Sequence, residues 1–433
     1  MMDVLFVNAP NVRWTHGHIR FGCRSGSRWP WTSVDNPTDY APFPFFMAHA
    51  TSYLKSKGVN AGLYDAVVRR EFDYGPAIEY IIGRKPTIVV IETSTPTIDI
   101  DLIMARRCAL FSEVALSGPH ATIFAEELSK LSYISYVLKG EYELSSYDMW
   151  SSRRKGVYEC CPVEDIDTAP YPYRDPEVIN NYWDPSPIPI PRPQLQVYAS
   201  RGCPYQCTYC MWPSVMYAKT FRPRNPLSVA AEIKFCLERF NSKSIFFDDD
   251  TFNIGTERIS SLCDELQVIG LPWTMMGRLD TSPKWLFDKM VDSGCAGMRF
   301  GVETFCAHIQ KRIKKMLDVD KAINMLEYLK VKHPHLPIHI TTMCNLPGET
   351  SQDRDFSNAI VEKLGFDNSG RIHNHQLSSC VPFPGTDLYK QLDSMGFGKQ
   401  LLDFYAYDGS QSNESEISKA IVSLGRNARE YTH

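Results

Sequence analysis

The stretch RGCPYQCTYC occupies residues 201–210, directly after a short apolar run at Leu195–Ala199. Its cysteines Cys203, Cys207 and Cys210 have the spacing C-x3-C-x2-C. Three thiolates this close on one loop can bind one soft metal centre. They suit a four-iron cluster with one iron left open, because a closed cluster takes four cysteines. The sequence therefore predicts an iron–sulfur centre just after a strand.

A structural zinc ion is the competing interpretation of this loop, with the three cysteines and a distant histidine as ligands. Zinc motifs usually come as two C-x2-C pairs, and the sequence has no second pair. The cluster is therefore the preferred interpretation.

Strand and helix patterns alternate on both sides of the cysteine loop, from residue 195 to residue 395. Apolar runs predict strands at Leu195–Ala199, Ser244–Phe247, Trp273–Met276, Gly297–Gly301, Ile338–Met343 and His375–Ser379. Helical patterns lie between them, at Leu227–Phe240, Thr256–Ile269, Pro283–Ser293, Asp318–Lys332 and Ser351–Leu364. Six such units predict an open (β/α)6 barrel, with its chemistry at the carboxyl ends of the strands.

A second alternation covers residues 1–145. Strands are expected at residues 3–8, Asn60–Tyr64, Thr87–Glu92, Val114–Ser117 and Tyr136–Lys139. Helices are expected at Phe45–Ser56, Gly75–Ile82, Asp99–Phe111 and Phe124–Leu131. The pattern predicts a doubly wound, Rossmann-like α/β domain.

Residues 146–194 are expected to link the two domains. Nine of the 29 prolines lie between Pro162 and Pro193. Proline fixes φ and lacks an N–H donor, so this stretch is predicted to be extended rather than helical. A proline-rich peptide ligand is the competing interpretation. Residues 396–433 are predicted to be a polar, loosely held tail.

The composition limits the class of protein. Among 433 residues, 46 Lys and Arg against 50 Asp and Glu give a net charge of −4. This balance argues against a strongly basic nucleic-acid binder, so no nucleic-acid partner is expected. No apolar run approaches the roughly 18 residues of a membrane span. An odd number of cysteines, 13, excludes a fully paired disulfide scaffold. With no secretory signal at the start, a reducing cytoplasm is expected.

The cysteine loop, with Tyr209 just before its third cysteine, resembles that of the radical S-adenosylmethionine (radical SAM) enzymes, and the resemblance extends over nearly the whole chain. It implies that the open iron chelates the amino and carboxylate groups of S-adenosylmethionine. Reductive cleavage then yields a 5′-deoxyadenosyl radical. An external electron donor such as flavodoxin or ferredoxin is implied as a partner.

Later strand ends carry further parts of this resemblance. Asp249 and Asp250 lie where the family contacts the methionine ammonium, which needs acceptors, although the usual Gly-Gly-Glu is absent. The competing interpretation is an acidic, solvated strand end. Glu303 lies in a Gly-x-Glu segment whose carboxylate can accept both ribose hydroxyls. Arg278 either pairs with a carboxylate of substrate or S-adenosylmethionine, or forms a structural salt bridge. Tyr209 completes the expected S-adenosylmethionine site.

The first domain resembles the cobalamin-binding domain of the cobalamin-dependent radical SAM branch. Loops at strand carboxyl ends are expected to hold the corrin, because glycine lets backbone approach a ligand closely. The residues concerned are Thr93, Ser94, Thr95, Ser117, Gly118, Pro119, His120, Gly140 and Glu141. The cobalt-binding motif Asp-x-His-x-x-Gly is absent, so no histidine is expected on cobalt. A degenerate domain without cobalamin is the alternative.

The resemblance favours a cobalamin-dependent methyltransferase that acts on an unactivated carbon of a small metabolite or lipid. One alternative keeps the cofactors but catalyses a cyclisation or rearrangement without methyl transfer. Another, from a different class, is a non-catalytic metal-binding protein.

Overall fold

The protein is described by a computed structural model that covers residues 2–10, 12–15, 18–22, 31–33, 40–184, 188–367, 372–402 and 415–424, the three short ranges at 12–33 by backbone alone. The chain forms two compact units. Unit 1 comprises Met1–Asp184, Ser214–Ala218 and Leu402–Asp408. Unit 2 comprises Pro185–Pro213, Lys219–Leu401 and Gly409–His433.

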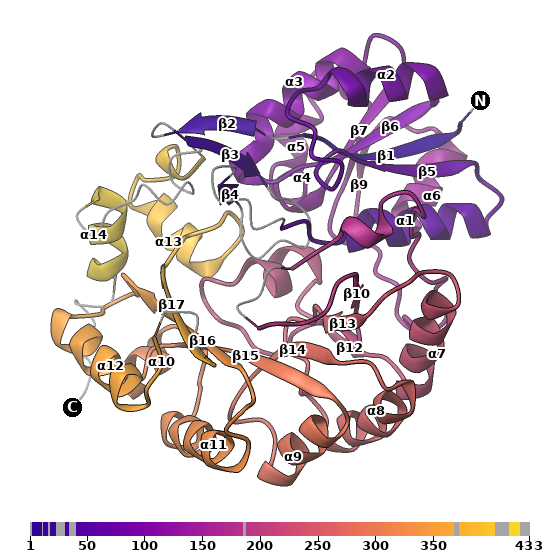
Figure 1. The fold of residues 1–433 in the computed structure, drawn as a ribbon. Coiled ribbons are helices and arrows are strands. Elements are labelled where there is room, and N and C mark those ends of the chain that lie inside the picture. Colours follow the sequence, from indigo (N-terminus) through magenta and orange to yellow (C-terminus); the bar gives the residue numbers. More distant parts are fainter. Residues whose placement is uncertain are drawn as a thin grey trace. The chain divides into compact units, whose positions relative to one another are not determined.

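Unit 1 is built on a six-stranded parallel sheet with the order β5-β1-β6-β7-β8-β9 (Figure 1). Its strands are β1 (Val4–Asn8), β5 (Ala61–Asp65), β6 (Ile88–Glu92), β7 (Glu113–Ser117), β8 (Tyr136–Leu138) and β9 (Gly156–Tyr158). The strands are buried and rich in Val, Leu and Ile, as parallel strands covered on both faces must be. The order reverses at β1, which confirms the predicted doubly wound fold.

Helices cover both faces of this sheet. Apolar side chains of α2 (Gly75–Arg84), α3 (Ile98–Cys108) and α5 (Ala125–Leu128) share one core with the strands. The helices α1 (Phe45–Ser56) and α6 (Glu143–Ser152) pack against each other, α1 on β5 and α6 on β8. The short helices α4 (Gly118–Ile123), η1 (Thr95–Thr97) and η2 (Ile179–Asn181) also belong to unit 1, and η3 (Trp212–Met216) has its last three residues there.

The structure differs from the predicted domain boundary at residue 145, because unit 1 continues to Asp184. The helix α6 and the strand β9 lie inside the stretch predicted to be a linker. Their signals are weak: α6 has four serines in ten residues, and β9 is only three residues long. A small antiparallel sheet of β2 (Val12–Thr15), β3 (His18–Gly22) and β4 (Trp31–Ser33) was not predicted either.

Unit 2 contains the second six-stranded parallel sheet, whose strands follow chain order. They are β10 (Gln194–Val197), β13 (Ser244–Phe247), β14 (Trp273–Gly277), β15 (Cys295–Glu303), β16 (Ile338–Cys344) and β17 (His373–Ser379). Its helices are α7 (Pro226–Leu237), α8 (Thr256–Ile269), α9 (Lys284–Asp292), α10 (Ala307–Arg312), α11 (Val319–Lys332), α12 (Ser351–Lys363), α13 (Asp387–Ser394), α14 (Glu416–Ser423) and η4, which begins at Gln400. All six predicted strands are present, and β13 and α8 have the predicted bounds.

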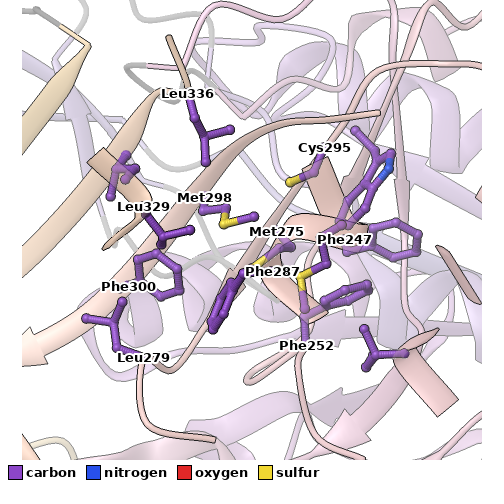
Figure 2. Close-up of a cluster of buried hydrophobic side chains, with 14 of the residues drawn as sticks. Phe247, Phe252, Met275, Leu279, Phe287, Cys295, Met298, Phe300, Leu329 and Leu336 are labelled. Atoms are coloured by element: carbon purple, nitrogen blue, oxygen red, sulfur yellow. The ribbon is translucent and has the colours of Figure 1, made fainter. Parts of the chain in front are cut away.

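Side chains that point to the helix-covered face of this sheet form one apolar core (Figure 2). Alternate strand residues such as Phe247, Met275, Met298 and Phe300 pack there against helix residues such as Phe287. Successive side chains of a strand point to opposite faces, so the residues between these face the inner side. The core therefore fixes which strand residues can line a site.

The proline run belongs to unit 2 and contributes buried side chains, rather than serving only as a linker. Ile188 and Ile190 are buried. A Cβ built on Gly297 would lie 2.4 Å from Cγ2 of Ile188, so the isoleucine fills the space that a side chain at this position would need. Pro185 and Pro187 lie outside the described residues.

The C-terminal stretch also differs from the predicted loosely held tail. The helix α14 buries Ile417, Ala420 and Ile421. It is held by a backbone bond from the N–H of Gly348 to the carbonyl of Val422 at 3.1 Å. The sequence did not predict this amphipathic helix, because it has only eight residues and follows a polar run. None of the described helices is long and apolar enough to cross a membrane.

Candidate functional site

The cysteine loop of unit 2 is fixed at its base and near its middle. A two-stranded ribbon of β11 (Ser200–Gly202) and β12 (Phe221–Pro223) closes its base. At Thr208, the N–H donates to the carbonyl of Ile313 at 2.9 Å, and the carbonyl accepts from the N–H of Leu388 at 3.0 Å. The loop after β10 is thus held as a defined structure before any ligand binds.

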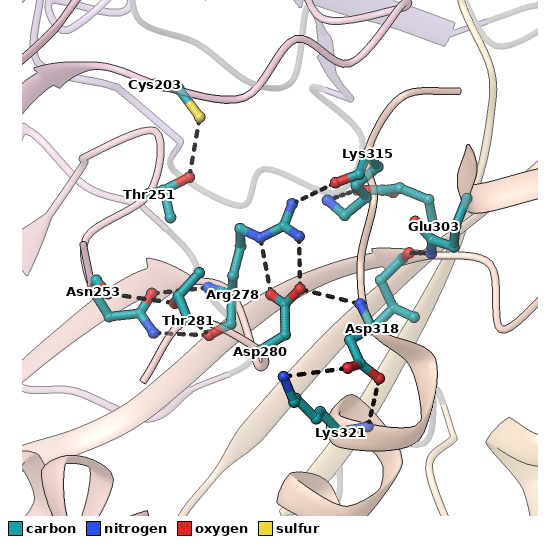
Figure 3. Close-up of polar contacts among 12 residues, drawn as sticks. Cys203, Thr251, Asn253, Arg278, Asp280, Thr281, Glu303, Lys315, Asp318 and Lys321 are labelled. Atoms are coloured by element: carbon teal, nitrogen blue, oxygen red, sulfur yellow. Dashed lines mark hydrogen bonds and ion pairs between the residues drawn. The ribbon is translucent and has the colours of Figure 1, made fainter. Parts of the chain in front are cut away.

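The three predicted cluster cysteines lie on this loop and are half-buried. Sγ of Cys203 lies 3.4 Å from Oγ1 of Thr251, which follows β13 (Figure 3). Burial raises the pKa of Cys203, and it raises that of Cys210 well above the ordinary value, where Cys207 adds to the effect. The thiols of Cys203 and Cys210 therefore stay protonated until a metal cation displaces their protons.

Three thiols on one short loop are the donor set of an iron–sulfur cluster, in which each cysteine binds a different iron. Such a cluster does not require the sulfur atoms to converge on one point. Within the described ranges, no three or more His, Cys, Asp and Glu side chains are gathered as a single metal ion would need. The residues present therefore fit a multi-iron cluster by their chemistry and spacing.

Asp249 holds the start of the cysteine loop. This fully buried carboxylate accepts from the backbone N–H of Ala199 at 3.0 Å and from Oγ of Ser200 at 2.5 Å. Asp250 is half-buried and contributes to the raised pKa values of Cys203 and Cys210, so it lies near the thiols. Of the two predicted aspartates, Asp250 is the one that stands beside the cysteines.

Arg278, at the end of β14, forms the structural salt bridge that was one of its two predicted roles. Its Nε and Nη2 donate to the two oxygens of Asp280 at 3.0 and 2.9 Å. Its Nη1 donates to the carbonyl of Lys315 at 2.9 Å, and the guanidinium carbon lies 3.8 Å from the ring centroid of Tyr205. Arg278 therefore packs against Tyr205 of the cysteine loop, while its donors are directed to Asp280 and Lys315 (Figure 3).

Glu303 ends β15 in an unusual conformation. Its φ is +67°, a region that side-chain-bearing residues rarely adopt, and the β15–β16 register shifts at this point. Oε1 accepts from Nζ of Lys315 at 2.9 Å. Among the described residues, Oε2 accepts no hydrogen bond. A Cβ on Gly301 would lie 2.6 Å from Oε1, so the glycine leaves room for the carboxylate.

Lys315 is the residue of this site that the sequence did not reveal. It is buried, and burial alone would lower its pKa, but Glu303 and Cys207 together raise the pKa above the ordinary value. In sequence it is one of two adjacent lysines after a helix, a pattern typical of a solvated surface. Burial raises the pKa of Tyr209 well above its ordinary value, with Glu303 and Cys207 as the next causes.

In unit 1, the predicted loop residues after β6 and β7 are joined to each other. The N–H and hydroxyl of Thr93 donate to the carbonyl of Ser117, each at 2.8 Å. Gly118 has a φ of +89°, and a Cβ there would lie 2.6 Å from the carbonyl oxygen of Thr93. Only glycine fits this close backbone approach. Ser94 is half-buried, and Pro119 is buried in α4.

His120 is also part of this packed corner. Its Nδ1 lies 3.0 Å from Oγ1 of Thr95, and its ring stacks on Phe124. Burial lowers the pKa of His120 to about 4, so the imidazole is neutral at neutral pH. Its contacts are those of a residue that holds two loops together.

The loop after β8 is packed in the same way. Gly140 has a φ of +58°, and a Cβ there would lie 2.4 Å from Sγ of Cys160. Glu141 is fully buried. At the end of β5, the buried carboxylate of Asp65 accepts from Asn8, Tyr182 and two backbone N–H groups, and burial raises its pKa to about 6. Except for the half-buried Ser94, the predicted loop residues at these strand ends are therefore buried within unit 1.

The comparisons with known proteins agree with this geometry. Residues 197–359 match the family model of the radical SAM superfamily. The chain is 25% identical over 303 residues to an uncharacterised methyltransferase of Pyrococcus horikoshii, covering 64% of this chain and 62% of that protein. It is also 25% identical over 287 residues to the bacteriochlorophyllide d C-12(1)-methyltransferase of Chlorobaculum tepidum, covering 64% and 59%.

The fold also matches a solved structure across nearly the whole chain. The radical S-adenosylmethionine methyltransferase TsrM from Kitasatospora setae, solved with cobalamin and a [4Fe-4S] cluster, superposes with a TM-score of 0.67. The match covers 91% of this chain and 75% of that one at 13% identity, so it establishes a shared fold. The chain spans less than two thirds of the length of the two curated relatives.

Proposed function

Residues 197–359 belong to the radical SAM superfamily, and from this premise we propose that the chain is a cobalamin-dependent methyltransferase acting on an unactivated carbon of a small molecule. The observation that carries the proposal is the cysteine loop, anchored at Thr208 and placed beside the Glu303–Lys315 pair at strand carboxyl ends. Parallel α/β sheets bind their ligands at these ends.

The proposed cofactors of unit 2 are a [4Fe-4S] cluster and S-adenosylmethionine. Cys203, Cys207 and Cys210 would hold the cluster. When bound, these two cofactors supply the reductive cleavage that generates a 5′-deoxyadenosyl radical. An external one-electron donor of the flavodoxin or ferredoxin type is the implied partner. No disulfide is formed among the described cysteines, which supports a reducing compartment such as the cytoplasm.

The residues around the cysteines receive distinct roles in this proposal. Oε2 of Glu303 would accept from the ribose hydroxyls, while Lys315 holds Oε1. Asp250 would face the methionine ammonium, and Tyr209 would pack beside the bound molecule. Asp249 and Arg278 would act by holding the loop, because their polar atoms are already engaged within the protein.

Cobalamin would bind at the carboxyl ends of the strands of unit 1. The fold shared with a cobalamin-bound methyltransferase supports this assignment. When bound, cobalamin supplies the methyl group that the substrate carbon receives. His120 is bonded to Thr95 and buried, so it would leave cobalt without a histidine ligand from this turn.

The inner face of the second sheet supports a small polar substrate. Thr274, His339 and Thr341 alternate with the core residues of their strands and therefore point to this face. His339 and Asn374 lie 3.2 Å apart across neighbouring strands. The buried Oγ1 of Thr274 has no hydrogen-bond partner among the described residues, and a lipid tail would leave it so, at a cost of about 1–3 kcal/mol.

The test is anaerobic reconstitution of the full chain with iron, sulfide and cobalamin, followed by reduction in the presence of S-adenosylmethionine. We expect iron–sulfur absorbance and 5′-deoxyadenosine in the wild type. Both should be lost in the variant that carries Cys203→Ala, Cys207→Ala and Cys210→Ala. Cys236→Ala, a change at a buried helix cysteine, is the control that should keep both.

Full cluster assembly in the triple variant would contradict the assignment. With candidate substrates, a product heavier by one CH2 group identifies methyl transfer. A product of unchanged composition would instead identify a rearrangement.

A further inference from the structure

The turn Ile313–Met316, which follows α10, contacts three parts of the site in unit 2. The carbonyl of Ile313 accepts from the N–H of Thr208, which lies between the second and third cysteines. The carbonyl of Lys315 accepts from Nη1 of Arg278, at the end of β14. Nζ of Lys315 donates to Oε1 of Glu303, at the end of β15. One four-residue segment thus joins the cysteine loop to two strand ends (Figure 3).

The backbone of this turn is strained where it presents the lysine. Lys314 has a φ of +53° and Met316 a φ of +55°, so both neighbours of Lys315 adopt left-handed conformations. Such a conformation is unfavourable for a residue with a side chain and persists only where its surroundings enforce it. The neighbouring lysine takes the opposite, exposed position, because Nζ of Lys314 pairs with Asp387 on the surface. The turn therefore holds a lysine inward against its backbone preference.

Glu303 is fixed by the same region of the chain. Nε2 of Gln310 donates to the carbonyls of Val302 and Thr304, at 2.7 and 2.6 Å, on either side of the strained glutamate. The carbonyl of Gln310 in turn accepts from the N–H of Met316 at 3.3 Å. The conformation of Glu303 and the position of Lys315 are therefore set by one connected network.

From these contacts we infer that Lys315 is a positioning residue that couples the Glu303 carboxylate to the cysteine loop. The inference rests on the proposed function, in which the loop holds the cluster and Glu303 binds the ribose. Lys315 directs Oε1 of Glu303 inward and leaves Oε2 for the ligand. Its ammonium belongs to the turn that bonds Thr208, and the guanidinium carbon of Arg278 lies 3.8 Å from the ring centroid of Tyr205, so both bring positive charge to the cysteine loop.

Two measurable consequences follow from this placement. Without the lysine, Glu303 loses its fixed orientation and S-adenosylmethionine binds more weakly. The cluster gains one electron on reduction from an external one-electron donor, with no bond made or broken. Loss of a nearby positive charge disfavours this added negative charge, so the midpoint potential becomes more negative.

The experiment compares Lys315→Met with Lys314→Met in the reconstituted full-length protein. Methionine keeps the unbranched chain and removes the charge, and Lys314 is the matched, exposed control in the same turn. We measure iron content, S-adenosylmethionine affinity by calorimetry, and the cluster potential by an electron paramagnetic resonance titration without S-adenosylmethionine. Lys315→Met should bind about tenfold more weakly, as for one lost charge-assisted bond, and show a more negative potential. Lys314→Met should match the wild type.

A double variant separates positioning from general destabilisation. In the Glu303→Gln background, Lys315→Met should weaken binding little further, because the partner is already lost. Additive losses would overturn the inference, as would wild-type affinity and potential in Lys315→Met. If Lys315→Met does not retain iron, two other variants decide the question. One is the double variant. The other is Lys315→Arg, which keeps the charge and should restore part of the affinity. Absence of a cluster in the wild type would instead overturn the proposed function.

Discussion

At the scale of single residues, the most informative position is Glu303, a strand-end carboxylate with one oxygen held by Lys315. Glu303→Gln keeps the size of the side chain but loses its charge. We expect S-adenosylmethionine binding to weaken by roughly 1–3 kcal/mol, the range for a hydrogen bond to a charged group. Calorimetric titration of the reconstituted protein measures this, and unchanged affinity would count against the ribose role.

The charge of His120 gives a prediction about pH. Its pKa is about 4 in the folded protein, against 6.5 for the free side chain. The unfolded chain therefore takes up the proton first, and stability falls as the pH drops from 6.5 towards 4. At about pH 5 this contribution amounts to roughly 2 kcal/mol relative to neutral pH.

The measurement compares denaturant unfolding of the wild type and of His120→Gln at neutral pH and at about pH 5. The variant should lose less stability on acidification, because glutamine does not titrate. Asp65 works in the opposite direction: its pKa is raised to about 6, so protonation stabilises the folded state below that pH. Since Asp65 is present in both proteins, the difference between them reports His120. Equal acid sensitivity would show that this histidine is not buried as described.

The residues of the site differ in how far the sequence can reveal them. Cysteine spacing and the Gly-x-Glu segment depend on neighbours in the chain, so they can be recognised directly. Lys315 cannot, because its role depends on contacts with Arg278 and Glu303 that only the fold creates. For Arg278, the sequence left two roles open, and the contact with Asp280, two residues away, decides for the salt bridge.

At the scale of elements, strongly patterned segments were predicted well. The helix α1 has the predicted bounds, Phe45–Ser56, and seven of its twelve residues are buried. The helix α6 and the strand β9 were missed, since short and serine-rich segments gain their stability from packing rather than from local preference. Helix and strand propensities and the periodicity of apolar residues therefore do not reveal such elements.

The helix α14 provides a test of how firmly the C-terminal segment is attached. Ile421 is 1% exposed, and its truncation to alanine should destabilise unit 2 by roughly 2–5 kcal/mol, as for other buried aliphatic residues. Lys419→Ala, on the exposed side of the same helix, should change stability by less than about 0.5 kcal/mol. Thermal unfolding of both variants measures the difference. Equal stabilities would mean that α14 is not packed on its unit in solution.

At the scale of the whole molecule, the two parallel sheets divide the proposed chemistry, with the cluster and S-adenosylmethionine assigned to unit 2 and cobalamin to unit 1. We expect the full chain to retain cobalamin with no histidine on cobalt, because His120 is already bonded to Thr95. An electron paramagnetic resonance spectrum of the loaded, Co(II) protein is the measurement. Nitrogen superhyperfine splitting from a histidine would contradict this prediction. Failure to retain cobalamin would favour the degenerate-domain alternative.

The residues Ser214–Ala218 belong to unit 1, although the chain on both sides of them belongs to unit 2. Met216 is fully buried there, and its sulfur accepts from the hydroxyl of Thr122 at 3.9 Å. The two units therefore cannot each be replaced by a single continuous stretch of another gene. A gene fusion made at residue 184 would join a foreign first unit to a chain that still carries Ser214–Ala218, a segment that packs in the original unit 1. We therefore expect the two halves of the gene to be inherited and engineered together.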